Sequence, residues 1–291
     1  MSAYLEHKLH QIPNSYNLKR TNFEYQLDSI QTLILGSSHA LNAINPAYLS
    51  TPTYNLANVS QSLDYDQLLT LKYLPQLPRL KTVIITLSYF SFYERLEDTD
   101  EAWRTYYYLH FWNLSTIYTD RGFDWRKHSL IALYTPSTTL KYAVQHFAVN
   151  EAPRLALNGY MRKDTNETYG DINDIAGLAK VKVHETTFHL QRQSEMLDSL
   201  SKFINLLVNH HIDVVLVTTP TYNTYSKFLD PTIVQQNLRM TDGLCQQFHI
   251  RYLNYANDLR FRLSDFANND HLNDRGARKF SQIFEGDLRH L

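Results

Sequence analysis

The hydrophobic positions along the chain form short runs separated by longer segments of mixed polarity. Four runs are rich in aliphatic and β-branched residues and are bounded by turn or polar residues, and a shorter candidate lies between the first two. Apolar runs of this length are typical of strands buried on both faces of a sheet. The expected strands are residues 32–35, 53–56, 82–87, 214–218 and 251–253.

Three of these strands follow segments whose apolar residues recur at helical spacing. The segments are residues 65–77, 193–210 and 233–248. Helices that alternate with strands in this way predict parallel strands joined by right-handed crossovers. The pattern therefore predicts an α/β protein, a three-layer α/β/α sandwich around a mostly parallel sheet.

Residues 94–183 break the alternation, because they hold all three tryptophans and no convincing buried strand. We interpret them as a mostly helical, aromatic-rich insertion within a single domain of residues 1–291. The aromatic cluster at residues 103–112 is expected to be the insertion's own core. The alternatives are a lid over the active site and a surface that stacks on sugar rings. Residues 158–174 are rich in Gly, Asn, Asp and Thr, which predicts an exposed loop.

Composition and charge exclude several classes of function. The formal net charge is −1 and no run of like charges stands out, so neither a nucleic-acid nor an anionic-membrane partner is expected. No apolar stretch approaches the roughly 18 to 20 residues that cross a bilayer. Residues 1–8 are polar where a secretory peptide would be apolar, so we expect a cytoplasmic protein.

The scarcity of glycine and cysteine excludes further chemistry. Glycine occurs only 8 times, and the Gly-rich motifs that bind dinucleotides or nucleoside triphosphates are absent, so no cofactor is expected. Cys245 is the only cysteine, which excludes an internal disulfide and a thiolate zinc cluster. His184 and His189 are five residues apart, and on a helix their side chains would point about 140° apart, so no metal site is expected there.

The first stretch with candidate chemistry is Gly36-Ser37-Ser38, which directly follows an expected buried strand. Ligands of open α/β sheets bind beyond the carboxyl ends of the strands, so a reactive side chain belongs at such a turn. Gly36 permits a tight turn, and Ser38 would lie at a helix N-terminus, where free N–H groups could stabilise an oxyanion. The alternative is that Ser37 or Ser38 only caps the next helix.

The second stretch lies near the C-terminus, where His271 stands among short polar residues before an expected amphipathic helix at residues 276–288. A histidine beside carboxylates and amides suits general-base work, because a neighbouring acceptor can fix its tautomer and stabilise the imidazolium. A surface histidine in a capping turn is the alternative.

Taken together, the two stretches resemble the SGNH (GDSL-like) hydrolase superfamily. In that family a Gly-x-Ser turn after the first strand carries the nucleophile, and a late Asp-x-x-His motif supplies the base. The resemblance implies a flavodoxin-like fold with Ser38 as nucleophile and His271 as base. It also assigns residues 54–60 to the second block, so that the N–H groups of Ser38 and Ser60 form the oxyanion hole. Residues 214–220 and 271–277 are similar to the branch found among bacterial polysaccharide-modifying proteins.

Two positions depart from the family pattern. The third-block Asn, an oxyanion donor, is absent where the strand ends in Thr86-Leu87-Ser88, and Ser88 or Asn58 is the candidate replacement. Asn268 stands where the family has the Asp of Asp-x-x-His. An amide oxygen can accept from an imidazole N–H, but it stabilises the imidazolium less than a carboxylate does. We therefore expect a Ser38–His271 dyad, helped by Asp270 or Asp265.

The resulting functional hypothesis is a serine esterase that removes acyl groups from a carbohydrate or a related ester. One alternative is an O-acyltransferase that acts on a polysaccharide precursor, since the same dyad would serve both reactions. The other is a non-catalytic carbohydrate-binding protein that keeps the fold, motivated by Asn268 and by the missing third-block Asn.

Overall fold

The structure is a computed structural model of the 291-residue chain, and it describes residues 2–120, 122–134, 154–163 and 171–289. Its centre is one sheet of five parallel strands, in the order β2-β1-β3-β4-β5. The strands are β1 (Thr32–Leu35), β2 (Thr53–Asn55), β3 (Thr82–Thr86), β4 (Asp213–Thr218) and β5 (Arg251–Asn254). The sequence-based strands agree with them to within one residue at each end.

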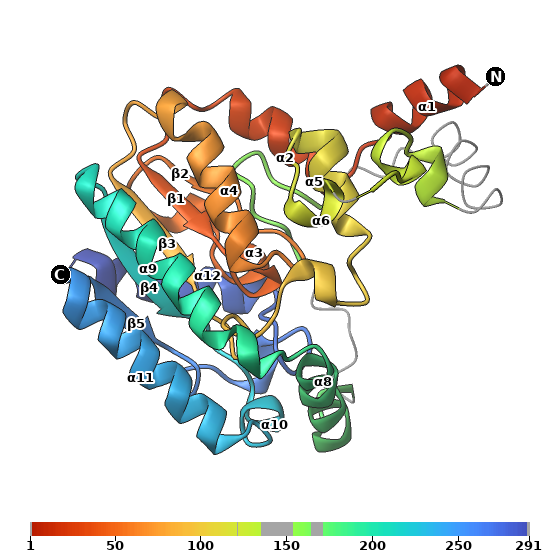
Figure 1. Ribbon diagram of the computed structural model, residues 1–291. Coiled ribbons are helices and arrows are strands. Elements are labelled where there is room, and N and C mark those ends of the chain that lie inside the picture. The colour runs from red at the N-terminus through yellow and green to blue at the C-terminus, as the bar shows by residue number, and fades with distance from the viewer. Residues whose placement is uncertain (1, 121, 135–153, 164–170, 290–291) are drawn as a thin grey trace.

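Helices cover both faces of this sheet, as Figure 1 shows. One face packs against α4 (Leu63–Tyr73), α9 (Gln193–Asn209) and α11 (Pro231–Phe248), and the other packs against α3 (Ser38–Ala43) and α12 (Asp274–Arg289). The predicted three-layer α/β/α sandwich is therefore confirmed. The other α-helices are α1 (Ser2–Gln11), α2 (Ser15–Glu24), α5 (Arg104–Trp112), α6 (Ile117–Asp120), α8 (Asp174–Thr186) and α10 (Asn223–Ser226).

Short 3-10 turns link several of these elements. They are η1 (Pro46–Tyr48), η2 (Leu74–Gln76), η3 (Leu96–Asp98), η4 (Trp125–Lys127), η5 (Ile131–Leu133), η7 (Leu190–Arg192) and η8 (Leu263–Asp265). None of the helices within the described ranges has the length and apolar character needed to span a membrane.

The aromatic cluster of residues 103–112 lies on α5 and at its start, and it does not form a separate core. Tyr107, Tyr108, Phe111 and Trp112 are buried in the same hydrophobic cluster as the inner face of the sheet. They pack against α2, whose Tyr16 lies with its ring centroid 5.1 Å from that of Tyr108. The expectation of an insertion with its own core is wrong, because α1 and α2 provide a partner surface that the sequence analysis did not predict.

The segment 158–174 is also less exposed than predicted, although residues 164–170 lie outside the described residues. Gly159 and Tyr160 are buried. The Asn158 carbonyl accepts a hydrogen bond from Asn55 N–H at 2.9 Å, which extends the edge of the sheet beyond β2. At least this part of the segment therefore packs against the sheet edge and does not face water.

Candidate active site

The turn after β1 places Ser38 at the first position of α3. Gly36 has a φ of 133°, and a Cβ atom there would lie 2.9 Å from Thr86 Cβ, so a side chain would be both strained and obstructed. The Gly36 N–H donates to Asp66 Oδ1 at 2.8 Å. Ser37 is the N-cap of α3 and its Oγ accepts from His39 N–H at 3.4 Å. Capping is therefore the role of Ser37, and the Ser38 hydroxyl is left for another partner.

The buried amide side chain of Asn55 holds α3 in place from the neighbouring strand. Asn55, at the end of β2, is fully buried, and its Nδ2 donates to the carbonyls of Ala40 at 2.9 Å and Ile44 at 2.8 Å. Its Oδ1 accepts from Ala57 N–H at 3.1 Å. One side chain therefore ties the second block to the helix that carries Ser38.

The loop before α12 is built in the same way. Asn273 is fully buried, donates to the Ser264 and Phe266 carbonyls at 3.0 Å each, and accepts from Gly276 N–H at 3.0 Å. A Cβ atom on Gly276 would lie 1.9 Å from the Asp265 carbonyl oxygen, so only glycine fits. These contacts fix the backbone on which His271 stands.

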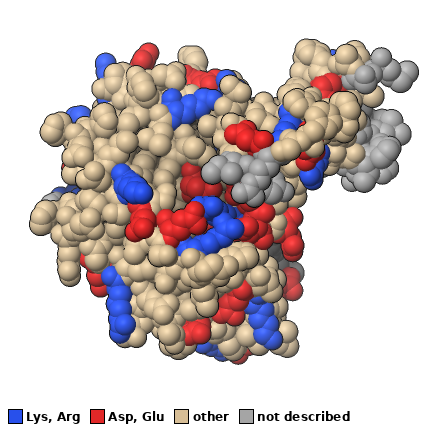
Figure 2. Space-filling model, viewed as in Figure 1, with Lys and Arg blue, Asp and Glu red and all other residues tan. Residues whose placement is uncertain are grey.

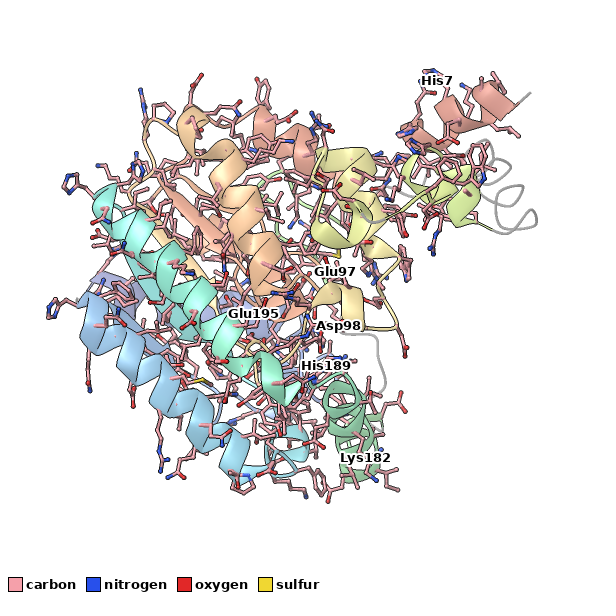
Figure 3. All side chains as sticks on the ribbon, viewed as in Figure 1. His7, Glu97, Asp98, Lys182, His189 and Glu195 are labelled. Atoms are coloured by element: carbon pink, nitrogen blue, oxygen red, sulfur yellow. The ribbon has the colours of Figure 1, made fainter. Side chains whose placement is uncertain are left out.

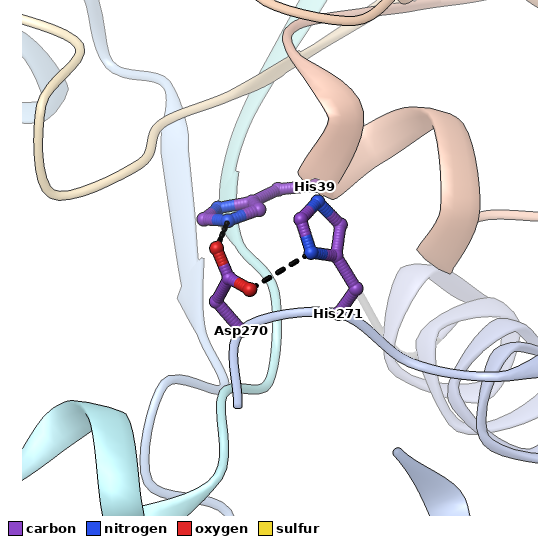
Figure 4. Close-up of side chains that lie close together, drawn as sticks. All are labelled: His39, Asp270 and His271. Carbon is purple, nitrogen blue, oxygen red and sulfur yellow. Dashed lines mark hydrogen bonds and ion pairs between the residues drawn. The ribbon is translucent and has the colours of Figure 1, made fainter. Parts of the chain in front are cut away.

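The structure brings Ser38 and His271 together. Nε2 of His271 lies 2.8 Å from Oγ of Ser38, and Nδ1 of the same ring lies 2.9 Å from Oδ1 of Asp270 (Figure 4 shows the imidazole and the carboxylate). His271 is 8% exposed and Asp270 is 2% exposed. The arrangement is a serine, a histidine and a carboxylate in hydrogen-bonding sequence, as a charge-stabilised general base requires.

The electrostatics of this pair keep the carboxylate charged and the imidazole neutral. Burial opposes ionisation of Asp270, but the charge and hydrogen bonds of His271 and His39 outweigh it and hold the pKa of Asp270 well below its usual range. Burial lowers the pKa of His271 to about 4, although Asp270 works in the opposite direction. At neutral pH the imidazole is therefore unprotonated at Nε2 and ready to accept a proton.

Asn268 has a backbone role as well as a contact with the ring. Its Oδ1 accepts from the N–H of His271 at 2.8 Å and from the N–H of Asp270 at 3.2 Å, and it lies 3.1 Å from His271 Nδ1. Asp265 does not approach His271 but binds Lys279 at 2.9 Å and the Arg262 N–H at 3.0 Å. Of the two candidate helpers, the structure therefore brings only Asp270 to the imidazole.

Three further basic side chains surround Asp270, and no motif in the sequence placed them in the site. His39 Nε2 lies 3.4 Å from Asp270 Oδ2, while His184 Nε2 and Lys180 Nζ each lie 3.8 Å from the same oxygen. Burial lowers the pKa of His184 to about 3. The position of His39 beside Ser38 was an available signal for its place in the site. No spacing signal marked His184, which belongs to α8.

The expected oxyanion donors divide into two groups. Ser60 has a left-handed φ of 53° and lines the same pocket as Ser38 and His271. Among the hydrogen bonds of the described residues, none uses the backbone N–H of Ser38 or Ser60. Asn58 is buried and donates its N–H to the Gly36 carbonyl, whereas the Ser88 hydroxyl contacts His39 Nδ1 at 2.9 Å. Neither lines the Ser38 pocket, so we assign neither to the oxyanion hole.

The pocket over Ser38 has a volume of about 360 Å³, and charged side chains line part of its wall. Glu94, Asp100, Glu101 and Lys180, all from residues 94–183, line it. Burial raises the pKa of Glu94 to about 7. The segment interpreted as an insertion therefore supplies much of the pocket wall.

A second charged hollow lies on the face shown in Figure 2 and is separate from this site. It is lined by acidic residues and two arginines, and Figure 3 shows that Glu97 and Asp98 of η3 face Glu195 of α9. Arg95 pairs with Glu195 at 2.6 Å, and Arg192 pairs with Asp98 at 3.1 Å. The hollow shares no lining residue with the Ser38 pocket. Its ion pairs connect the η3 region to α9 and η7.

The residues best placed to hold a metal lie in the same cluster of side chains around Asp270. His39, Asp270 and His271 each offer a ligand atom within 4.8 Å of the others, and within the described ranges no other such group occurs. Both ring nitrogens of His271 already lie at hydrogen-bonding distance from Ser38 and Asp270. A metal held by His271 would therefore displace one of those two contacts. His184 and His189 do not converge, since His184 faces Asp270 and His189 follows the end of α8.

The comparisons with known proteins assign no family to the chain. No protein-family model matches the chain, and no curated protein sequence matches it. Among solved structures, the chain is similar to one described as a "putative acylhydrolase" from Bacteroides fragilis, with a TM-score of 0.42 and 11% sequence identity. The match covers 96% of this chain and 99% of that chain.

Proposed function

We propose that this protein is a serine hydrolase that cleaves ester bonds through Ser38, His271 and Asp270. The observation that carries the proposal is the placement of His271, with Nε2 2.8 Å from Ser38 Oγ and Nδ1 2.9 Å from Asp270 Oδ1. A hydroxyl is a weak nucleophile until a base takes its proton, and a buried carboxylate stabilises the imidazolium that results.

The reaction begins with proton transfer from Ser38 Oγ to His271 Nε2 as Oγ attacks the carbonyl carbon of the ester. The oxygen of the tetrahedral intermediate becomes negative, and the free N–H groups of Ser38 and Ser60 are the donors assigned to it. The C–O bond of the ester then breaks, and His271 returns the proton to the departing alcohol. Water repeats the sequence on the acyl-enzyme and releases a carboxylic acid.

The substrate class that fits the pocket is an ester of a carbohydrate or another polyhydroxylated alcohol. Glu94, Asp100 and Thr187 offer oxygen atoms that can accept from sugar hydroxyls, and they lie in the same pocket as Ser38. The Glu94 Oε2 atom accepts from Thr187 Oγ1 at 2.7 Å, so this part of the wall is ordered before substrate binds. Sparse polar groups on a fixed wall are the usual means of orienting a polar ligand.

Asp270 also bears on the non-catalytic alternative. That alternative was motivated by the amide at position 268, which would stabilise an imidazolium weakly. The buried carboxylate of Asp270 lies on the same ring nitrogen, and it favours a protein that still performs chemistry.

The test is hydrolysis of a short-chain nitrophenyl ester by the wild type and by Ser38→Ala. The matched control is Ser201→Ala, a serine of α9 that lines neither this pocket nor the hollow beside it. Loss of turnover in Ser38→Ala alone supports the proposal, and equal turnover in all three proteins overturns it.

The same assay separates hydrolysis from acyl transfer. A sugar acceptor is added, and the products are analysed by mass spectrometry. Unchanged ester loss with free carboxylic acid as the product supports the esterase. Faster ester loss with acylated sugar as the product supports the O-acyltransferase alternative, because a sugar hydroxyl has then replaced water.

A further inference from the structure

We propose that His39 is a positioning residue that holds the Asp270 carboxylate against His271, and that Ser88 fixes the tautomer in which it does so. The inference rests on the proposed function, because it gives His39 and Ser88 a part in the same reaction. Neither residue touches the reacting atoms.

The geometry places the His39 ring between the Ser88 hydroxyl and the Asp270 carboxylate. It is 4% exposed and lies on the first turn of α3, next to Ser38. Its Nε2 lies 3.4 Å from Asp270 Oδ2 and its Nδ1 lies 2.9 Å from Ser88 Oγ. The hydrogen-bonded chain therefore runs from Ser88 through His39, Asp270 and His271 to Ser38.

The tautomer of His39 follows from its neighbours. Nε2 faces a carboxylate that carries a negative charge and only accepts hydrogen bonds, so this nitrogen must hold a proton. In the neutral ring Nδ1 is then an acceptor, and the Ser88 hydroxyl donates to it. Ser88 can play this part because its hydroxyl carries a hydrogen that rotates freely.

Asp270 depends on this contact because, within the described residues, no other side chain lies within hydrogen-bonding distance of its Oδ2 atom. His39 and His271 are the side chains within hydrogen-bonding distance of the carboxylate among the described residues. His184 Nε2 and Lys180 Nζ lie 3.8 Å from Oδ2, beyond hydrogen-bonding distance. A buried carboxylate oxygen without a donor is costly, so removing His39 favours rotation of Asp270 away from His271.

His39 and Ser38 are neighbours at the start of α3. The same helical turn therefore carries the nucleophile Ser38 and His39, the residue that orients Asp270. Asn55 anchors this helix through its bonds to Ala40 and Ile44. One short, anchored element therefore places both Ser38 and the side chain that contacts Asp270 Oδ2.

The first test is the protonation of the rings, measured by NMR on protein labelled with 15N in its imidazoles. His39 is expected to carry hydrogen on Nε2, and His271 is expected near neutral pH as the tautomer with hydrogen on Nδ1. The His39 signals are assigned by their loss in His39→Gln. A His39 ring with hydrogen only on Nδ1 overturns the inference, and this readout needs no enzymatic activity.

The second test is kinetic and compares His39→Leu with His39→Gln. Leucine removes the donor, whereas the glutamine Nε2 can still donate to Asp270. We expect kcat of His39→Leu to fall about 10- to 100-fold with KM unchanged, as for a misplaced catalytic group. His39→Gln should retain most of the wild-type kcat. Ser88→Ala should lower kcat less than His39→Leu does.

The outcomes separate this inference from the proposed function. If Ser38→Ala is inactive but His39→Leu keeps wild-type kcat, the role of His39 is wrong and the hydrolase stands. If Ser38→Ala keeps full activity, the hydrolase itself is wrong. Melting temperatures of the variants distinguish lost positioning from lost folding. Equal loss of kcat in the glutamine and leucine variants, with equal melting temperatures, also contradicts the positioning role.

Discussion

The Nε2 atom of His271 lies 2.8 Å from the Oγ atom of Ser38, although 233 positions of the chain separate the two residues. The proximity follows from the parallel sheet, since the turn after β1 and the loop before α12 meet beyond the carboxyl ends of the strands. Asn55 and Asn273, both fully buried, fix the two backbones that carry these side chains. The site is therefore assembled by the fold before any substrate arrives.

Asp270, not Asn268, is expected to be the catalytic partner of His271. Asp270→Asn should lower kcat by about 10³- to 10⁴-fold, because loss of the triad carboxylate has this effect in serine proteases. Asn268→Ala should cost less, since Asp270 still accepts from Nδ1. Steady-state kinetics on both variants check the order, and a larger loss in Asn268→Ala would show that the amide is the true partner.

The activity should be insensitive to pH across the neutral range. Burial lowers the pKa of His271 to about 4, so the imidazole is already a free base well below pH 6. The kcat/KM profile should rise through the pKa of His271 and stay level from pH 6 to pH 8. Circular dichroism at each pH serves as the control for unfolding. A midpoint near 6.5, the value for an ordinary histidine, would contradict the expected burial effect.

Removing the charge of Asp270 should move the acid limb of the kcat/KM profile to lower pH. The carboxylate raises the pKa of His271, so Asp270→Asn should displace the midpoint of the residual activity toward lower pH. A midpoint that moves toward higher pH, or that does not move, would show that the two groups do not interact as described.

Gly36 should tolerate no side chain. Gly36→Ala places a Cβ atom 2.9 Å from Thr86 Cβ at a φ of 133°, and such strained positions typically cost about 1 to 3 kcal/mol. Gly243 is the matched control, because it lies within helix α11 and no atom comes within 4 Å of the place that a Cβ would take there. Gly243→Ala should stabilise the protein by about 0.5 to 1 kcal/mol. Urea denaturation of both variants tests the contrast, and similar effects would refute it.

Lys19 should make stability depend on pH in the alkaline range. Its amino group is fully buried and donates to the carbonyls of Asn55 and Ala57, and burial holds the pKa of Lys19 well below its usual range. The unfolded chain binds the proton more tightly, so the free energy of unfolding should rise with pH up to the ordinary lysine pKa, by up to about 1.4 kcal/mol per pH unit.

The variant Lys19→Met should lose this dependence, whereas the exposed Lys202→Met on α9 should keep it. Urea denaturation at a series of pH values from 7 to 10 gives the slopes. Equal slopes in the wild type and in Lys19→Met would mean that the buried lysine stays protonated.

The sheet and the placement of Ser38 and His271 could be predicted from the sequence because their signals are local. An apolar run such as Thr32–Leu35 is expected to be buried on both faces, as in the centre of a sheet. The Gly-Ser-Ser turn that follows it must then lie at the carboxyl end of a central strand. The partner of His271 could not be predicted, because Asp270 and Asn268 both lie within reach and side-chain rotation decides between them. His184 and the burial of α5 against α2 depend on long-range packing, which no local spacing reveals.

The most direct measurement of the central claim is labelling by a fluorophosphonate, which reacts with an activated serine hydroxyl and marks it permanently. Peptide mass spectrometry of the labelled wild type should find the phosphonyl group on Ser38 and should find none on the neighbouring Ser37. Labelling should be abolished in Ser38→Ala and strongly slowed in His271→Ala. Labelling that persists unchanged in Ser38→Ala, or a label on another serine, would contradict the account.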